Sequence, residues 1–170
     1  MQVSIRNKWI SFKESSEVKD ANENDVLIVE GKFLSLTRKK FVRDMDKKLL
    51  YMVRNKFWIF LAKKAMIFDA EGNQVAFIKR KVFTLKDHYI INSKLGNLEI
   101  KGNILGFDYH ISLNGEEVGH ISRKISLRDS FVLDLKDGLD LPFFVALTIA
   151  IDNITDRRRN DDGVQFGSDQ

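Results

Sequence analysis

Residues 142–152 read PFFVALTIAID, and this is the longest apolar stretch of the chain. No charged residue lies between Asp140 and Asp152. Asp140 is a suitable N-cap for a helix, and Pro142 would stand in the first turn, where its missing N–H costs nothing. A helix over about 142–153 would be apolar on every side, so it must be surrounded by apolar material. The β-branched residues of the stretch leave a buried strand as the alternative.

The length of this stretch argues against a membrane anchor. A helix over 142–153 would be about 18 Å long at about 1.5 Å per residue, whereas a bilayer core needs about 30 Å. Asp140 before it, and Asp152 with the arginines of residues 157–159 after it, prevent an extension in either direction. We therefore expect no transmembrane span and a helix enclosed by a sheet.

The rest of the chain is predicted to form short strands separated by polar turns. In the pair Asn114-Gly115, both residues accept a positive φ, which predicts a two-residue type I′ hairpin. The segment ESSEVKDANEN, residues 14–24, is predicted to be a polar loop. About eleven or twelve strands at such short intervals are typical of an all-β sandwich or barrel. The predicted strands cover residues 4–12, 26–33, 40–43, 49–60, 65–69, 74–84, 89–92, 98–101, 107–113, 117–125 and 131–135.

A short pattern recurs along these strands: an apolar residue, two further residues that are polar or basic, a lysine and another apolar residue. It appears as IRNKW (5–9), VRNKF (53–57), IKRKV (78–82) and ISRKI (121–125). A longer pair, EGKFLSL (30–36) and KGNILGF (101–107), also predicts an internal duplication. Because side chains alternate between the faces of a strand, the basic residues at two positions of the pattern should point outward. These candidate anion-binding residues are Arg6, Lys8, Arg54, Lys56, Lys79, Lys81 and Lys124.

The middle residue of each copy should face inward under the same alternation. These residues are Asn7, Asn55, Arg80 and Arg123. An inward arginine is unfavourable, and a β-bulge or a position near the rim of a barrel would relieve it.

The composition predicts a globular domain, and the motifs of the sequence indicate no catalytic chemistry. The chain has 170 residues, of which 44% are hydrophobic, and it contains no cysteine, so disulfides and thiolate metal sites are excluded. No Walker loop, Rossmann fingerprint or serine nucleophile motif is present, so we expect no enzyme and no cofactor. A regular hairpin at Asn114-Gly115 would pair His110 with Gly119 and Tyr109 with His120. The two histidines would then lie on opposite faces, so we expect no metal site.

The outward basic residues, together with Lys63-Lys64, allow two interpretations. Lysine on an outward strand face is ordinary solvation and edge protection. Alternatively, these residues contact acidic phospholipid headgroups, at about 1 kcal/mol for each basic residue near an anionic surface. A nucleic-acid-associated or regulatory protein is a further alternative, although few aromatic residues alternate with the basic ones to stack on bases. An enzyme or small-ligand carrier is disfavoured because the helix would fill the barrel.

The chain resembles the LURP-one-related family of small tubby C-terminal-like proteins, which are related to the phospholipid scramblase domain. The resemblance rests on the repeated hairpins, on VAFIKRKVF (75–83) and DYHI (108–111), and on the final ALTIAID (146–152). It covers about residues 1–154 and implies a closed, twelve-stranded antiparallel barrel, built from a duplicated hairpin unit, around a central hydrophobic helix. Residues 155–170 are predicted to be a disordered polar tail beyond this domain. The phosphoinositide-binding signature of tubby proteins has no match here.

Location and partners follow from these expectations. The N-terminal residues MQVSIRNKWISF lack the apolar core of a secretory signal, which indicates an intracellular protein. With a net charge of +4 the chain is mildly basic, which is compatible with an anionic partner but does not require one. We expect a cytoplasmic protein that lies peripherally at the membrane and binds anionic phospholipid or phosphoinositide headgroups, with a protein partner as the alternative and nucleic acid disfavoured. A closed barrel has no free edges, so a monomer is expected.

Overall fold

A computed structural model of the chain describes seven segments, and all statements on structure below concern them. They comprise residues 1–6, 15–31, 39–55, 64–81, 87–103, 108–124 and 130–164, without the side chains of residues 6, 123–124 and 155–164.

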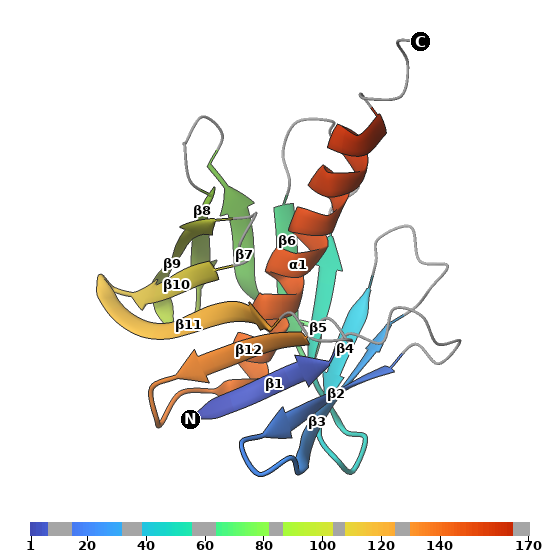
Figure 1. The fold of residues 1–170 in the computed structure, drawn as a ribbon. Coiled ribbons are helices and arrows are strands. Elements are labelled where there is room, and N and C mark those ends of the chain that lie inside the picture. The colour runs from blue at the N-terminus through green and yellow to red at the C-terminus, as the bar shows by residue number, and fades with distance from the viewer. Residues whose placement is uncertain are drawn as a thin grey trace.

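Twelve antiparallel strands form a closed barrel around one helix (Figure 1). Each strand pairs with its neighbours in the sequence, and β1 closes the barrel on β12, where Val3 lies opposite Leu133. Every strand therefore has two neighbours, and the barrel has no free edge. The elements are β1 Gln2–Arg6, β2 Ser15–Asp20, β3 Asp25–Gly31, β4 Lys40–Arg43, β5 Leu49–Asn55, β6 Lys64–Asp69, β7 Gln74–Arg80, β8 Asp87–Ser93, β9 Gly96–Asn103, β10 Asp108–Leu113, β11 Glu116–Lys124, β12 Ser130–Leu135 and α1 Leu141–Val164.

Strand β2 corrects the prediction of a polar loop over residues 14–24. It is paired with β1 on one side and with β3 on the other. Its one apolar residue, Val18, is fully buried in the core, whereas the others are partly exposed. Two hydrogen-bonded ladders and a single buried side chain hold this segment as a strand, and a hydrophobic pattern cannot reveal such a strand. The other eleven strands each overlap a predicted one.

Helix α1 is enclosed by the barrel and packs mainly against β5, β6 and β4 (Figure 1). All of residues 143–154 are buried, with at most 8% of any of them exposed. Twelve consecutive residues cover more than three turns, so every side of the helix is in contact with other parts of the chain. This confirms a helix enclosed by the sheet and excludes the alternative of a buried strand.

The helix begins as the sequence indicates. The carboxylate of Asp140 accepts the N–H of Phe143 at 3.1 Å through Oδ1, which is the arrangement of an N-cap. Its Oδ2 accepts the hydroxyl of Tyr51 at 2.5 Å, which ties the first turn to β5. Burial, and then this hydrogen bond, raise the pKa of Tyr51. The ring of Tyr51 also packs edge-on against Phe143, with 5.8 Å between the ring centroids.

The helix is longer than predicted. It continues to Val164, whereas the apolar stretch predicts an end near residue 153. Its backbone thus crosses into residues 155–170, and the division between a domain and a tail at residue 154 stays a prediction. None of the described residues belongs to a helix with the length and apolar content that crossing a bilayer requires.

The order of the strands agrees with the predicted duplication. β3 and β9, where the two longer copies of the repeat begin, are six strands apart in a barrel of twelve. A duplication of six strands would give this spacing. The duplication itself stays a prediction.

Candidate functional site

The inward arginine that the repeat predicts is neutralised by an ion pair. Arg80 lies opposite the buried Tyr89, and its Nη2 and Nε atoms lie 2.7 and 2.9 Å from Oδ1 of Asp87. Asp87 is only 4% exposed. The equivalent residue of another copy, Asn55, is buried in the interior as predicted. Arg80 is the last residue of β7, which agrees with the alternative of a position near the rim, and its charged partner, not a bulge, neutralises it. We assign this pair a structural role.

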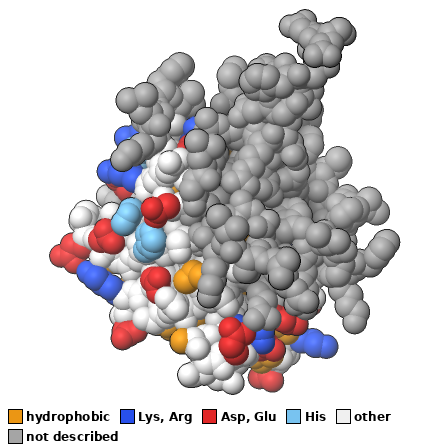
Figure 2. All heavy atoms as spheres, in the orientation of Figure 1, with side chains coloured by type: hydrophobic (Ala, Val, Ile, Leu, Met, Phe, Trp, Pro, Cys, Tyr) orange, Lys and Arg blue, Asp and Glu red, His pale blue; other side chains and the backbone are white. Residues whose placement is uncertain are grey.

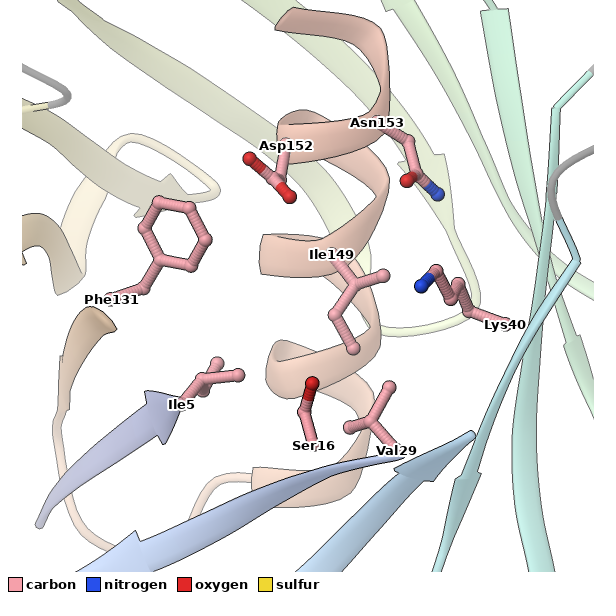
Figure 3. A pocket seen from close by; sticks show the side chains of 8 residues that line it. All are labelled: Ile5, Ser16, Val29, Lys40, Phe131, Ile149, Asp152 and Asn153. Carbon is pink, nitrogen blue, oxygen red and sulfur yellow. The ribbon is translucent and has the colours of Figure 1, made fainter. Parts of the chain in front are cut away.

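A small cavity lies beside α1 inside the barrel (Figure 3). It has about 20 Å³ in which the centre of a water molecule can move. This volume suits one water and is too small for an organic ligand. Asn153 contributes a buried Nδ2 that has no hydrogen-bond partner among the described residues. The cavity does not favour a small-ligand carrier. It is lined by Ile5, Ser16, Val29, Lys40, Phe131, Ile149, Asp152 and Asn153.

Three of the seven predicted basic residues have described side chains. These are Arg54, Lys79 and Lys81, and all three are exposed. Lys8 and Lys56 lie outside the described residues, as do the side chains of Arg6 on β1 and Lys124 on β11. Of the seven, Arg6 and Lys124 have their backbones on β1 and β11, and neither strand is next to β5, β6 or β7. Their role in binding stays a prediction.

The structure brings two of these residues together with Lys64. Lys64 on β6 lies directly opposite Lys79 on β7, and Arg54 on β5 lies opposite Met66, two residues along β6 on the same face. Lys81 follows Lys79 by two residues and is also exposed. We call Arg54, Lys64, Lys79 and Lys81 the basic face.

Apolar side chains lie between these cations. Met66 is opposite Phe77, and both are partly exposed. The Nζ of Lys64 lies 5.9 Å from the centre of the Phe77 ring, which is within the range of a cation–π contact. Strands β5, β6 and β7 contain a single acidic residue, Asp69, at the other end of β6 from Lys64. Cations over an apolar strip with no nearby carboxylate on these strands can receive an anion.

A β-bulge in the hairpin of β10 and β11 overturns the prediction that His110 and His120 lie on opposite faces. The turn itself is as predicted, since Asn114 and Gly115 have φ values of 52° and 91°. The register then shifts between Ile111 and Ser112, and this places His110 directly opposite His120. The centroids of the two imidazole rings are 4.9 Å apart.

The cause of the bulge lies in β11. Val118 and Ile121 are three positions apart and both buried, so a strict alternation of faces must break between them. Gly119 makes the break feasible, because a Cβ there would lie 2.7 Å from Cδ2 of Leu135 and 2.8 Å from the carbonyl oxygen of Asp134. The two apolar residues at a spacing of three, with a glycine between them, are the sequence signal that could have revealed the bulge.

Two carboxylates accompany the histidines. Asp108, two residues before His110 on β10, contacts Nε2 of His120 through Oδ1. Glu117 places Oε1 3.3 Å from Nδ1 of His110. Figure 2 shows histidine side chains in pale blue gathered with acidic side chains in red on this surface. We call Asp108, His110, Glu117 and His120 the histidine cluster.

Comparisons with known proteins agree with this fold. The sequence signature of the LURP-one-related family matches residues 1–152. Protein YxjI of Bacillus subtilis (strain 168) is 26% identical over 156 residues, which cover 91% of this chain and 93% of YxjI. The X-ray structure of the Arabidopsis thaliana protein AT5G01750 superposes with a TM-score of 0.66 at 16% identity, covers 90% of each chain and shows the same fold. The chain therefore belongs to the LURP-one-related family.

Proposed function

We propose that the protein is a non-enzymatic binding module that docks on anionic phospholipid headgroups at the cytoplasmic face of a membrane. Membership of the LURP-one-related family favours a binding fold over an enzyme. The docking surface that we propose is the basic face on β5, β6 and β7, where Arg54, Lys64 and Lys79 occupy three adjacent strands.

The observation that carries this proposal is the direct pairing of Lys64 with Lys79. Like charges directly opposite each other on two strands are unfavourable for stability. Edge protection would be an ordinary reason for lysine on a strand, but β6 and β7 are paired on both sides in a closed barrel. Edge protection therefore does not explain the two lysines. Ordinary solvation and the contact of Lys64 with Phe77 do not require the two charges to face each other, whereas an anionic partner would balance them.

The expected strength is that of a reversible peripheral contact. At about 1 kcal/mol for each basic residue near an anionic surface, the four residues of the basic face supply about 4 kcal/mol, or roughly a thousandfold preference for an anionic over a neutral membrane. The partly exposed Met66 and Phe77 add apolar contact between the cations. Because the attraction is electrostatic, salt should weaken it.

Nucleic acid would be drawn to the same cations, but it fits this surface less well. Stacking of bases needs an open aromatic platform. The aromatic side chains beside the basic face are Phe77, which has Lys64 over its ring, and Phe68, which lies four residues from Lys64 along β6; both are only partly exposed. Nucleic acid is therefore an outcome of the test and not a second proposal.

Vesicle flotation tests the proposal. The chain should float with phosphatidylcholine vesicles that contain phosphatidylserine, and not with phosphatidylcholine alone, and added salt should release it. The double variant Lys64→Gln/Lys79→Gln should bind about thirtyfold more weakly, as the loss of two contacts of about 1 kcal/mol each predicts. The matched control is Lys48→Gln/Lys136→Gln, which removes two exposed lysines outside the basic face and should bind as the wild type does.

Two results would overturn the proposal. One is equal flotation with neutral and anionic vesicles. The other is equal weakening by the test variant and by its control, which would mean that only net charge matters. Salt-sensitive binding to single-stranded oligonucleotides that exceeds binding to vesicles, and that the test variant abolishes, would reassign the basic face to nucleic acid.

A further inference from the structure

We propose that Asp108, His110 and His120 form a binding site for a divalent first-row transition-metal ion, with Zn²⁺ as the test case. The site lies on β10 and β11, away from the basic face, and it does not rest on the proposed membrane contact.

The donor atoms are already gathered. One ligand atom from each of the three residues lies within 4.8 Å of the other two. In tetrahedral zinc sites the ligands stand about 2.0–2.2 Å from the ion, so neighbouring donors are roughly 3.4 Å apart. Oδ1 of Asp108 and Nε2 of His120 are already in direct contact and would separate to hold an ion between them, while the donor of His110 would approach them by about an ångström. Side-chain rotation on an exposed surface allows both movements. The strands hold the ligands in position: His110 and His120 are direct cross-strand partners, and Asp108 stands two residues away on the same face.

Glu117 would not bind the ion itself but would hold one of the ligating histidines in position. Histidines that bind a metal usually donate their other ring N–H to a carboxylate, which fixes the tautomer and the orientation of the ring. Oε1 of Glu117 lies 3.3 Å from Nδ1 of His110, and in this proposal Nδ1 keeps that partner while Nε2 binds the ion. Glu117 is thus a positioning residue in this proposal.

The surroundings favour a cation. Lys101, which lies opposite His110 on β9, would oppose a metal ion, but its Nζ is held 2.6 Å from the carboxylate of Glu99. On the other side, Asp134 of β12 lies opposite His120 and adds a negative charge. Its Oδ1 accepts a hydrogen bond from Nε2 of Gln2 at 2.7 Å. Because the glutamine amide is uncharged, this bond orients the carboxylate and leaves its negative charge in place.

The choice of ion follows from the donors. Two imidazoles and one carboxylate suit zinc, nickel, copper or ferrous iron, whereas magnesium and calcium prefer sites made of oxygen alone. The chain has three histidines and no cysteine. The third histidine, His88, lies on β8 with Nε2 3.1 Å from Glu99. The chain therefore offers one pair of imidazoles, which predicts one zinc ion per protein.

Calorimetric titration of the tag-free chain with Zn²⁺ tests the site, with Mg²⁺ as the control ion. We expect one saturable zinc site and no heat of binding with magnesium. His110→Ala and His120→Ala should each weaken binding more than about tenfold, since even the loss of an outer-shell partner costs about ten- to a hundredfold. Asp108→Asn should also weaken it, and Glu117→Gln should do so by less. The matched control is His88→Ala, which removes an imidazole outside the histidine cluster.

The outcomes separate clearly. No saturable zinc binding by the wild type would overturn the proposal, and so would unchanged binding by His110→Ala and His120→Ala. An equal loss in His88→Ala would mean that zinc binds wherever an imidazole is exposed. Circular dichroism without metal establishes that each variant is folded. Should the alanine variants unfold, Asp108→Asn carries the test, because it keeps the shape of the side chain and removes its charge.

Discussion

The basic face and the histidine cluster lie on the outside of one barrel, and the sequence reveals them very differently. On β5 and β7 the alternation holds within the repeated pattern, where Val53 and Ile78 are buried and Arg54 and Lys79 are exposed, and the register shift of the β6–β7 pair lies at its other end, between Ile67 and Phe68. On β11 the alternation breaks between Val118 and Ile121, and His120 changes face relative to a regular hairpin. A repeated pattern thus predicts a surface only as far as the register is regular, and a single bulge can assemble residues that the pattern separates.

The two surfaces also differ in charge. β5, β6 and β7 contain one acidic residue, whereas each of the strands β9 to β12 contains at least one. The first surface suits an anion and the second a cation. We therefore propose two sites of opposite preference on one barrel, and the predictions below test whether each depends on the barrel or on its own residues.

The largest effect should come from breaking the barrel itself. Ala146 is fully buried in the middle of α1. Ala146→Asp would place a charge among apolar side chains with no partner, at a cost of several kcal/mol, comparable to the whole stability of a domain. We expect loss of the cooperative thermal transition in circular dichroism, and with it the loss of both surfaces. A soluble variant with a wild-type melting curve would contradict an enclosed helix.

A variant with a smaller effect on stability should affect one surface and not the other. Gly119→Ala puts a Cβ against the carbonyl of Asp134 and the side chain of Leu135, and such overpacking costs about 1–3 kcal/mol. The strain falls at the bulge that aligns His110 with His120. We expect a lowered unfolding midpoint in urea and weaker zinc binding, with unchanged vesicle flotation. Zinc binding equal to that of the wild type would show that the cluster does not need the bulge.

The like-charge pair of the basic face should respond in the opposite direction. Lys79→Gln removes the charge opposite Lys64 and leaves Lys64 over the ring of Phe77. We expect the free energy of unfolding to rise by about 0.2–0.5 kcal/mol, while vesicle binding falls. Denaturant titration and flotation on the same sample measure both. A lower stability would instead give Lys79 a structural role and weaken the case for binding.

The smallest effect concerns Glu99, which lies between the two surfaces. The hydrogen bond from Lys101, with a further contribution from His88, holds the pKa of Glu99 below its ordinary value of 4.5. A lowered pKa in the folded state means that the carboxylate stabilises the fold above that value and loses this contribution as the pH falls through its folded pKa. The melting temperature of the wild type should therefore exceed that of Glu99→Gln at about pH 5.5, and the difference should shrink at about pH 3. A difference that is constant with pH would contradict this assignment.

Much of the fold could be predicted from the sequence, because its signals are local. The helix cap at Asp140, the turn at Asn114-Gly115 and the apolar run after Pro142 each need only a few neighbouring residues. Strand β2 could not be predicted, because Val18 is its single buried apolar residue and its ladders are formed with other strands.

The sites were harder to predict because they depend on register. The pairing of Lys64 with Lys79 needs two strands to be aligned. The neutralisation of Arg80 needs Asp87, seven residues away on the next strand. The histidine cluster needs a bulge whose cause is the burial of both Val118 and Ile121 in the core.

The central claim is that the barrel carries two independent binding surfaces. The most direct test measures vesicle flotation and zinc binding in parallel on two variants, Lys64→Gln/Lys79→Gln and His110→Ala/His120→Ala. We predict that the first variant loses vesicle binding and keeps the zinc affinity of the wild type, and that the second does the reverse. If either variant lost both activities while folded, or if neither variant lost either one, the assignment of two separate surfaces would be wrong.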